Sequence, residues 1–162
     1  MTEKRDTTLP PDDDARALAR GLLRGAGHAA LAVTDAATGT PGISRIALGR
    51  DAEGVPLTLV SALAPHHAAL AAHPDCALMV GEVGDRGDPL THPRLMIRAR
   101  AEFVAPGSAD RAALRDLWLA AHPKAKLYVD FADFAFVRLR PVSALLNGGF
   151  ARAFRMEPAD FL

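Results

Sequence analysis

The segment from Pro41 to Leu70 constrains the fold of this chain more than any other stretch. Residues 41–50 alternate with a period of two, which is typical of a β-strand. The turn cluster Asp51–Gly54 follows, and its glycine is able to adopt the positive φ that tight turns need. The residues after the turn are mostly apolar and predict a second strand. The segment therefore predicts a β-hairpin in which Pro41–Arg50 and Val55–Ser61 lie side by side.

A helix is predicted directly after this hairpin, over His66–Ala72, with Pro74 beyond its end. The hairpin and the helix start together carry two arginines, one hydroxyl and two imidazoles. These residues are Arg45, Arg50, Ser61, His66 and His67. Guanidinium groups and the N–H groups of a helix start are common phosphate partners, so the segment is a candidate phosphate site. The alternative, from the residues alone, is that both arginines are ordinary solvated residues of a strand.

The rest of the chain alternates strands and helices with short connections. Strands are predicted over 28–34, 75–83, 94–104 and 134–146, the last bent at Pro141, and helices over 15–24 and 109–121. Asp12–Asp14 and Ser108 are the expected helix caps. Antiparallel strands joined by hairpin-short connections predict a small β-barrel of the α+β class, not a doubly wound parallel sheet.

The length of 162 residues is enough for one domain with a sizeable core. Residues 1–11 are polar and predict a flexible N-terminal tail, followed by a single domain over 12–162. Three phenylalanines near the end, Phe150, Phe154 and Phe161, predict that the C-terminal segment packs against this domain.

Charge and cysteine content narrow the class of protein. Lys plus Arg and Asp plus Glu both number 19, so no net charge favours nucleic acid or an anionic membrane. The single cysteine, Cys76, excludes an intrachain disulfide and suits a reducing compartment. The start has no apolar leader, and no apolar run approaches the length of a spanning helix. These features predict a cytoplasmic protein.

Other residue clusters are assigned no chemistry. The six histidines lack an HExxH or CxxC context, so no metal site is predicted. Cys76 lies in an apolar strand and is expected in the core, not as a nucleophile. Ser61, His66 and Asp75 are triad residue types, but no GxSxG elbow supports acyl transfer. The acidic residues around the loop 84–93 are expected to be solvated and not to bind a cation.

Three motifs together resemble one known family. They are GISRIAL with GVPLTLVSALAPHHAAL, then LMVGEVGDRGDPLTHPRLMI, then ALLNGGFARAF. From Ala15 to Phe154 the chain resembles the FMN-binding split-barrel proteins related to pyridoxamine 5′-phosphate oxidase, and within them the haem-utilisation (HugZ-type) branch. The resemblance implies a six-stranded antiparallel split β-barrel with peripheral helices. It also implies a homodimer that holds FMN at its interface.

The resemblance further implies roles for individual residues. Arg45 would pair with the FMN phosphate, and the backbone of Ile46 and Ala47 would face the isoalloxazine. The other implied cofactor-binding residues are Arg50 at the end of the same strand, Val60 and Ser61 on the second phosphate strand, His66 and His67 where the oxidases carry Arg and Lys, and Arg94 near the flavin ring. Imidazoles titrate near neutrality, so this phosphate site would depend on pH.

Three functions remain open at this point. The resemblance favours an FMN-binding flavoprotein, an oxidoreductase of unknown small-molecule substrate, in which the flavin carries the chemistry. The first alternative is a haem-binding protein of haem utilisation, with a histidine as axial ligand. The second is a non-catalytic module that holds flavin, or no ligand, as a structural part. The catalytic residues are not identified by the sequence.

Overall fold

The computed structural model describes residues 8–162. Most of the predicted flexible tail, residues 1–7, therefore lies outside the described residues. Within the described part of that tail, the backbone N–H of Leu9 donates to the carbonyl oxygen of Ala153 at 2.8 Å, and Leu9 forms a parallel bridge with Phe154. Leu9 thus contacts the C-terminal region of the chain.

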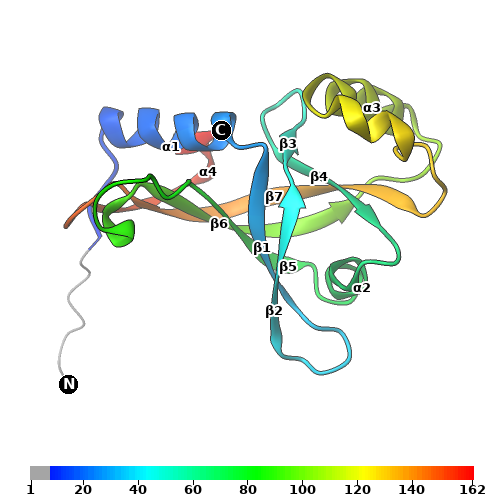
Figure 1. Ribbon diagram of the computed structural model, residues 1–162, viewed down its shortest axis with the longest axis horizontal. Coiled ribbons are helices and arrows are strands. Elements are labelled where there is room, and N and C mark those ends of the chain that lie inside the picture. The colour runs from blue at the N-terminus through cyan, green and yellow to red at the C-terminus, as the bar shows by residue number, and fades with distance from the viewer. Residues whose placement is uncertain (1–7) are drawn as a thin grey trace.

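A single antiparallel sheet forms the centre of the molecule (Figure 1). Within residues 8–162 its strands are β1 (His28–Thr34), β2 (Pro41–Ala47), β3 (Gly49–Arg50), β4 (Pro56–Ser61), β5 (Asp75–Val80), β6 (Arg94–Phe103), β7 (Phe134–Asn147) and β8 (Ala153–Met156). Their order is β2-β1-β5-β6-β7-β4-β3, and β8 pairs with β7. The α+β class and the split barrel are confirmed. The sheet has eight strands instead of the expected six, because segment 41–50 is divided in two and residues 153–156 add a short strand.

The predicted hairpin is wrong for most of its first strand. β2 pairs with β1 along its whole length, and only the two residues of β3 pair with β4. Between them lies Leu48, which is buried and whose N–H donates to the carbonyl oxygen of Gly27 at 3.0 Å. The chain bends there and passes from one end of the sheet order to the other. The buried Thr58 hydroxyl donates to the carbonyl oxygen of Ala47 at 2.8 Å, which links β4 to the end of β2 and closes the barrel.

Helices flank the sheet at both ends (Figure 1). They are α1 (Asp13–Gly25), α2 (Pro65–Ala72), α3 (Ala109–Ala121) and α4 (Pro158–Phe161), with short 3₁₀ turns η1 (Pro89–Thr91) and η2 (Pro123–Leu127). The predicted caps are confirmed: the Asp12 carboxylate accepts from the Ala15 N–H and the Ser108 hydroxyl accepts from the Arg111 N–H. None of the helices in residues 8–162 has the length and apolar character that crossing a bilayer would require.

Two apolar cores connect the helices to the sheet. The larger fills the barrel beneath α1 and α2, and includes Leu23, Leu31, Leu78, Leu95, Ile97, Leu146, Phe154 and Phe161. The smaller lies between α3, η2 and the strands β4 and β7, and consists of Leu57, Val104, Leu114, Trp118, Ala125, Val129 and Phe136. Docking of the C-terminal segment is therefore confirmed for Phe154 and Phe161. It is wrong for Phe150, which is 89% exposed at the tip of a turn.

The longest strand pair, β6 with β7, changes register near Pro141, where a bend was expected. Arg98 is opposite Ser143 and Ala99 is opposite Pro141, which leaves Val142 without a partner across the pair. Proline has no N–H to donate, so a bulge is the form in which a long strand accommodates it. As a result Val142 is 58% exposed on the outside of the sheet.

Candidate ligand-binding face

The side of the sheet that points away from the barrel core, called here the outer face, carries apolar side chains in register. On β1, Ala29 and Leu31 are buried, so the alternating residues between and beyond them point outward. The first row across the strands is Arg45, Ala30, Met79, Met96 and Leu145, and the second is Ile43, Ala32, Ala77, Arg98 and Ser143. The outer face is therefore one continuous surface made by five strands.

The outer face is flat at its centre and apolar. Three alanines on β1 and β5 leave little side-chain bulk there, while Ile43 at the β2 margin is 77% exposed and Met79 on β5 is 43% exposed. Soluble monomers rarely leave a contiguous apolar surface of this kind open, and where they do it marks a binding site for a ligand or another protein.

Two arginines flank the flat centre. Arg45 lies on β2 and Arg98 on β6, three interstrand steps apart and two residues apart along the strands, which corresponds to about 16 Å. Neither guanidinium forms a hydrogen bond or ion pair with another group in residues 8–162. Both side chains are exposed and keep their full hydrogen-bonding capacity for an anionic partner.

A cleft with a histidine borders the same face. His28 begins β1, and its Nε2 lies 2.8 Å from Oε1 of Glu82. Together with Arg45 and Met79 they line a cavity of about 150 Å³. Gly81 makes this placement possible: its φ is +123°, and a Cβ there would lie 2.5 Å from the carbonyl oxygen of Pro93. Sequence reasoning did not single out His28 or Glu82 as binding residues.

The other histidines have different surroundings. Both ring nitrogens of His92 are occupied within its own loop, by the Gly84 N–H at 2.6 Å and the Arg86 carbonyl at 2.8 Å. Nε2 of His122 lies 2.8 Å from the Leu48 carbonyl oxygen, and the ring stacks on Trp118. The remaining three, His66, His67 and His73, belong to α2 and its end. His28 is thus the histidine of the outer face.

The two adjacent histidines of α2 are only half exposed. Burial, and next the charge of the neighbouring His67, lower the pKa of His66 below its usual value. The His67 ring meets Phe103 edge-on, with 5.0 Å between ring centroids. A neutral imidazole is a weak partner for phosphate, so the lowered pKa makes His66 a poor phosphate ligand.

The nine residues predicted to hold FMN lie in several places. Arg45, Ile46 and Ala47 are on β2, and Val60 and Ser61 end β4. His66 and His67 begin α2, Arg50 lines a separate cleft with Arg24 and His122, and Arg94 begins β6. Arg45 and Ser61 therefore do not share a strand pair, contrary to what the hairpin prediction assumed.

Two of these residues have partners inside the chain. The Ser61 hydroxyl donates to Oδ2 of Asp133 at 2.8 Å, so a phosphate at Ser61 would meet a carboxylate. Arg94 donates to the carbonyl oxygens of Leu90 and His92, at 3.0 and 3.4 Å, and so braces the loop before β6. No ligand tests the nine positions, and as a binding set they stay a prediction.

Cys76 behaves as a core residue. Its Sγ lies 3.6 Å from the carbonyl oxygen of Ala99, and its side chain packs against the larger core. Burial, and next the charge of Asp75, raise the pKa of the thiol to about 11. A thiol with that pKa is protonated near neutral pH, which disfavours a nucleophilic role.

An antiparallel barrel closed at Leu48, with an open outer face, defines a split-barrel protein. No family model matches the chain. It is 33% identical over 152 residues to the chloroplastic non-canonical heme oxygenase HOZ of Arabidopsis thaliana, covering 94% of this chain and 44% of that protein. A heme binding protein from Mycobacterium smegmatis is 27% identical with a TM-score of 0.80, covering 95% of this chain and 61% of that one. The chain thus spans less than two thirds of both relatives.

A more distant structural neighbour is described by a phosphate oxidase family and not by haem. It is a protein from Clostridium acetobutylicum related to general stress protein 26 and assigned to the pyridoxinephosphate oxidase family. It is 14% identical, has a TM-score of 0.69 and covers 93% of this chain and 99% of its own, so it shows the shared fold. The predicted resemblance to the split-barrel proteins related to pyridoxamine 5′-phosphate oxidase, and to their haem-utilisation branch, is thus confirmed.

The expectation of FMN as cofactor is corrected by these comparisons. The relatives at 33% and 27% identity both have haem in their names, and neither name mentions flavin. The structure supplies a physical reason for the correction at Ser61, where Asp133 accepts the hydrogen bond that was assigned to a phosphate.

Proposed function

We propose that this protein binds haem on the outer face of its sheet. The observation that carries the proposal is the flat apolar surface flanked by two unpaired arginines, Arg45 and Arg98. Haem is a flat apolar macrocycle with two carboxylate side chains. An apolar surface suits its ring, and arginines suit its carboxylates. The alanines on β1 and β5 would lie under the ring, and the guanidiniums would pair with the propionates. The haem-named relatives support the same ligand.

His28 is the proposed axial ligand. It stands at the edge of the outer face, and its contact with Glu82 is of the kind that fixes the tautomer and orientation of a ligating imidazole. Once bound, haem would supply an iron centre for redox and O₂ chemistry. The chain itself would orient the ring through His28, hold the propionates through the arginines and exclude water with Met79 and Met96.

A second copy of the chain is proposed to cover the other side of the ring. The outer face alone would leave one side of a bound macrocycle in water, together with Ile43 and Val142. A two-fold pair that brings two outer faces together would bury both, as expected for a homodimer. Light scattering of the purified protein tests this directly, and a monomer at micromolar concentration with haem bound would contradict it.

Part of the predicted binding set carries over to this site. Arg45 and Ala47 are on the outer face of β2, whereas the Ile46 side chain is 5% exposed and belongs to the core, so Ile46 would contribute only through its backbone. Arg50, Val60, Ser61, His66, His67 and Arg94 remain predictions to which no ligand is assigned.

The experiment is a titration of the purified protein with haemin, followed by the Soret band. We expect saturable binding and at least a roughly tenfold loss of affinity in Arg45→Gln and in Arg98→Gln, since a charge-assisted hydrogen bond contributes about 1.5–3 kcal/mol. His28→Ala should shift the Soret band and change the electron paramagnetic resonance signal of the ferric iron. His73→Ala, an exposed histidine at the end of α2, is the matched control and should change neither.

Two results would contradict the proposal. Absence of saturable haemin binding by the wild-type protein would remove haem as the ligand. Normal affinity in both arginine variants would remove the outer face as the site, even with haem bound. Addition of a reductant to the complex then shows, through loss of the Soret band over time, whether bound haem is degraded or only held.

A further inference from the structure

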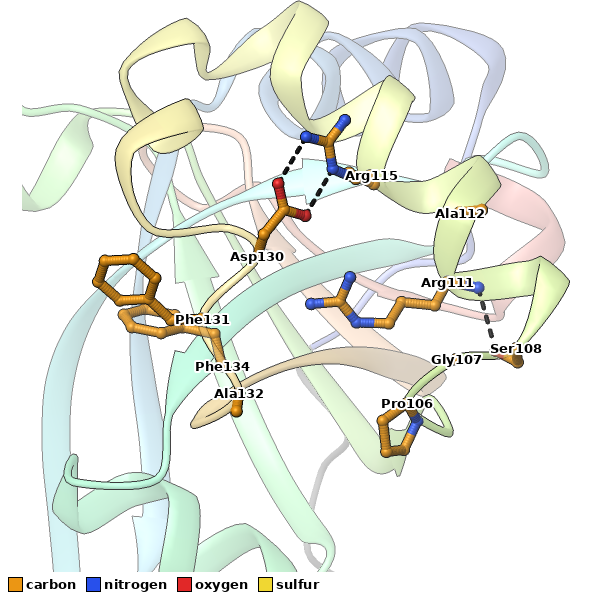
Figure 2. Close-up of a pocket in the computed structure, with 10 residues that line it drawn as sticks. All are labelled: Pro106, Gly107, Ser108, Arg111, Ala112, Arg115, Asp130, Phe131, Ala132 and Phe134. Atoms are coloured by element: carbon orange, nitrogen blue, oxygen red, sulfur yellow. Dashed lines mark hydrogen bonds and ion pairs between the residues drawn. The ribbon is translucent and has the colours of Figure 1, made fainter.

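A pocket lies between α3 and the loop that leads into β7 (Figure 2). It is called here the α3 pocket, and its volume is about 370 Å³, within the range of small-molecule sites. Its lining includes Ser108, Arg111, Arg115, Asp130, Phe131 and Phe134. None of these residues belongs to the outer face, so the pocket is independent of the proposed haem site.

The charges in the α3 pocket do not balance. Arg115 is committed to Asp130, with Nε and Nη2 donating to its two carboxylate oxygens at 2.7 and 2.6 Å. This bidentate contact lowers the pKa of Asp130, so the carboxylate is ionised and fully paired. Arg111 donates only to the carbonyl oxygen of Val129, at 2.8 Å, and no carboxylate in residues 8–162 accepts a hydrogen bond from its guanidinium. The pocket therefore keeps one positive charge without a direct partner.

The Arg111 side chain is held in place. Its guanidinium lies over the Phe136 ring, 5.5 Å from the ring centroid, and Figure 2 shows it extending from α3 toward Asp130 and Phe131. A guanidinium that is already fixed by a carbonyl and a ring loses little side-chain freedom when an anion binds. The structure thus offers a preorganised cation and not a mobile surface arginine.

Two aromatic rings form the apolar side of the same pocket. The rings of Phe131 and Phe134 are 6.4 Å apart and inclined at 68°, and Phe131 is 56% exposed. Edge-to-face pairs of this kind readily accept a third ring, because aromatic side chains favour such offset contacts. The pocket therefore combines an exposed phenylalanine with a guanidinium that has no carboxylate partner in residues 8–162.

We propose that the α3 pocket binds a small aromatic carboxylate. Its carboxylate would pair with Arg111, and its ring would pack against Phe131 and Phe134. The existing Arg115–Asp130 pair would leave the net charge of the lining suited to a monoanion.

The test is a titration of the ¹⁵N-labelled protein with benzoate as the probe, followed by amide chemical shifts. We expect saturable shifts confined to residues 106–112 and 130–134. Arg111→Gln should raise the dissociation constant of benzoate at least roughly tenfold, and Arg111→Lys should recover part of the loss, since it restores charge without the planar fork. Arg24→Gln, an exposed arginine at the end of α1, is the control and should bind like the wild type.

Two further measurements separate charge from ring recognition. Acetate, which lacks the ring, should bind much more weakly than benzoate, and equal affinity would overturn the aromatic part of the proposal.

Arg115→Gln should also weaken benzoate binding, because the released Asp130 carboxylate would then compete for Arg111. Benzoate affinity unchanged in Arg111→Gln, with amide spectra that show an intact fold, would overturn the site itself. Haemin affinity should not change in any of these variants.

Discussion

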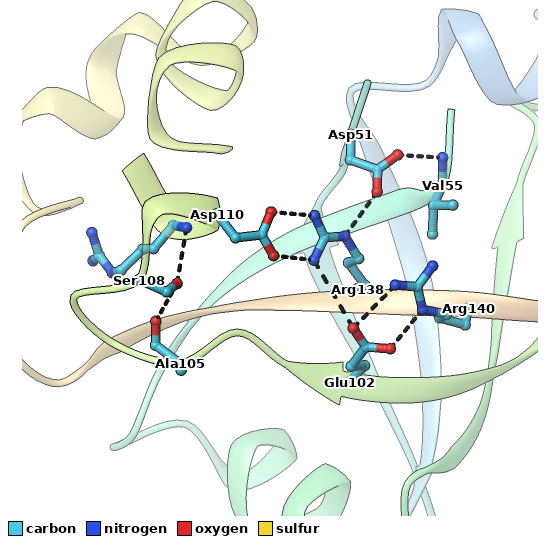
Figure 3. Close-up of polar contacts among 9 residues, drawn as sticks. Asp51, Val55, Glu102, Ala105, Ser108, Asp110, Arg138 and Arg140 are labelled. Carbon is cyan, nitrogen blue, oxygen red and sulfur yellow. Dashed lines mark hydrogen bonds and ion pairs between the residues drawn. The ribbon is translucent and has the colours of Figure 1, made fainter. Parts of the chain in front are cut away.

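Arg138 and Asp51 form an ion pair that is almost completely removed from solvent. Nε of Arg138 lies 2.8 Å from Oδ2 of Asp51, and the two side chains are 11% and 5% exposed (Figure 3). The same guanidinium binds both carboxylate oxygens of Asp110 on α3, at 2.6 and 2.8 Å. The other oxygen of Asp51 accepts from the N–H groups of Glu53 and Val55. One side chain of β7 thereby fixes α3 and the β3–β4 turn.

Arg138→Gln should therefore destabilise the fold by about 3 kcal/mol, because it leaves Asp51 with a buried and unpaired charge. Arg140→Gln is the matched control. Arg140 pairs with Glu102 on the same strand pair, but both side chains are nearly half exposed, and exposed ion pairs contribute about 1 kcal/mol or less. Urea unfolding followed by circular dichroism measures both, and equal effects would show that the burial of Asp51 is energetically unimportant.

The same network predicts how stability depends on pH. The hydrogen bonds from Arg138 and Arg140 hold the pKa values of Asp110 and Glu102 below their ordinary 3.8 and 4.5. A lowered pKa in the folded state stabilises the fold above the ordinary value, and this stabilisation disappears as the pH falls through the folded value. The urea midpoint should thus decrease below about pH 4.5. This decrease should be shallower in Arg138→Gln. An unchanged slope would show that Arg138 is not what lowers the pKa of Asp110.

Cys76 should react slowly with thiol reagents in the folded protein. Its pKa of about 11, against an ordinary 9.0, lowers the thiolate fraction at neutral pH about a hundredfold. Iodoacetamide labelling followed by mass spectrometry should show this retardation relative to the protein in urea. The rate in the folded state should rise about tenfold per pH unit, and a plateau below pH 9 would contradict the raised pKa.

Gly81→Ala should lower stability by about 2 kcal/mol and weaken haemin binding. The substitution forces a Cβ against the backbone of Pro93 and Arg94 at a φ of +123°, and it displaces Glu82 from His28. Gly21→Ala is the control, because the Gly21 Cβ position in α1 is open and alanine favours a helix by up to about 1 kcal/mol. Thermal unfolding of both variants checks the prediction, and similar melting temperatures would contradict it.

The local features of the fold could be predicted from the sequence, and the pairing of strands could not. The bounds of α3 follow from Ser108 and the helical spacing after it, and the predicted residues 109–121 match the structure. Alternation correctly marked 41–50 as extended, but alternation assigns a face and not a partner. The partner of β2 depends on the buried Leu48 and on contacts with Gly27 and Thr58, which lie far from it in sequence.

The candidate site was missed for the same reason. Ala30, Met79 and Met96 form one row only because three separate strands pair in a particular register. The visible signal was the run of small residues in HAALAVT, which alternates without a bulky or charged outward side chain after His28. Arg45 was identified, since arginine on a strand is conspicuous, while its partner across the face, Arg98, was hidden among the arginines of β6.

The bend at Leu48 also affects how the protein avoids self-association through its sheet. Open sheet ends expose backbone groups to which strands of other molecules can add, a common route to aggregation. Here the first and last strands of the sheet order, β2 and β3, are successive parts of one chain, and β3 is only two residues long. β8 is accompanied by Leu9. β2 pairs with β1 on one side only, so its other edge is the stretch that an incoming strand could meet, and Pro41 at its first position offers no N–H there.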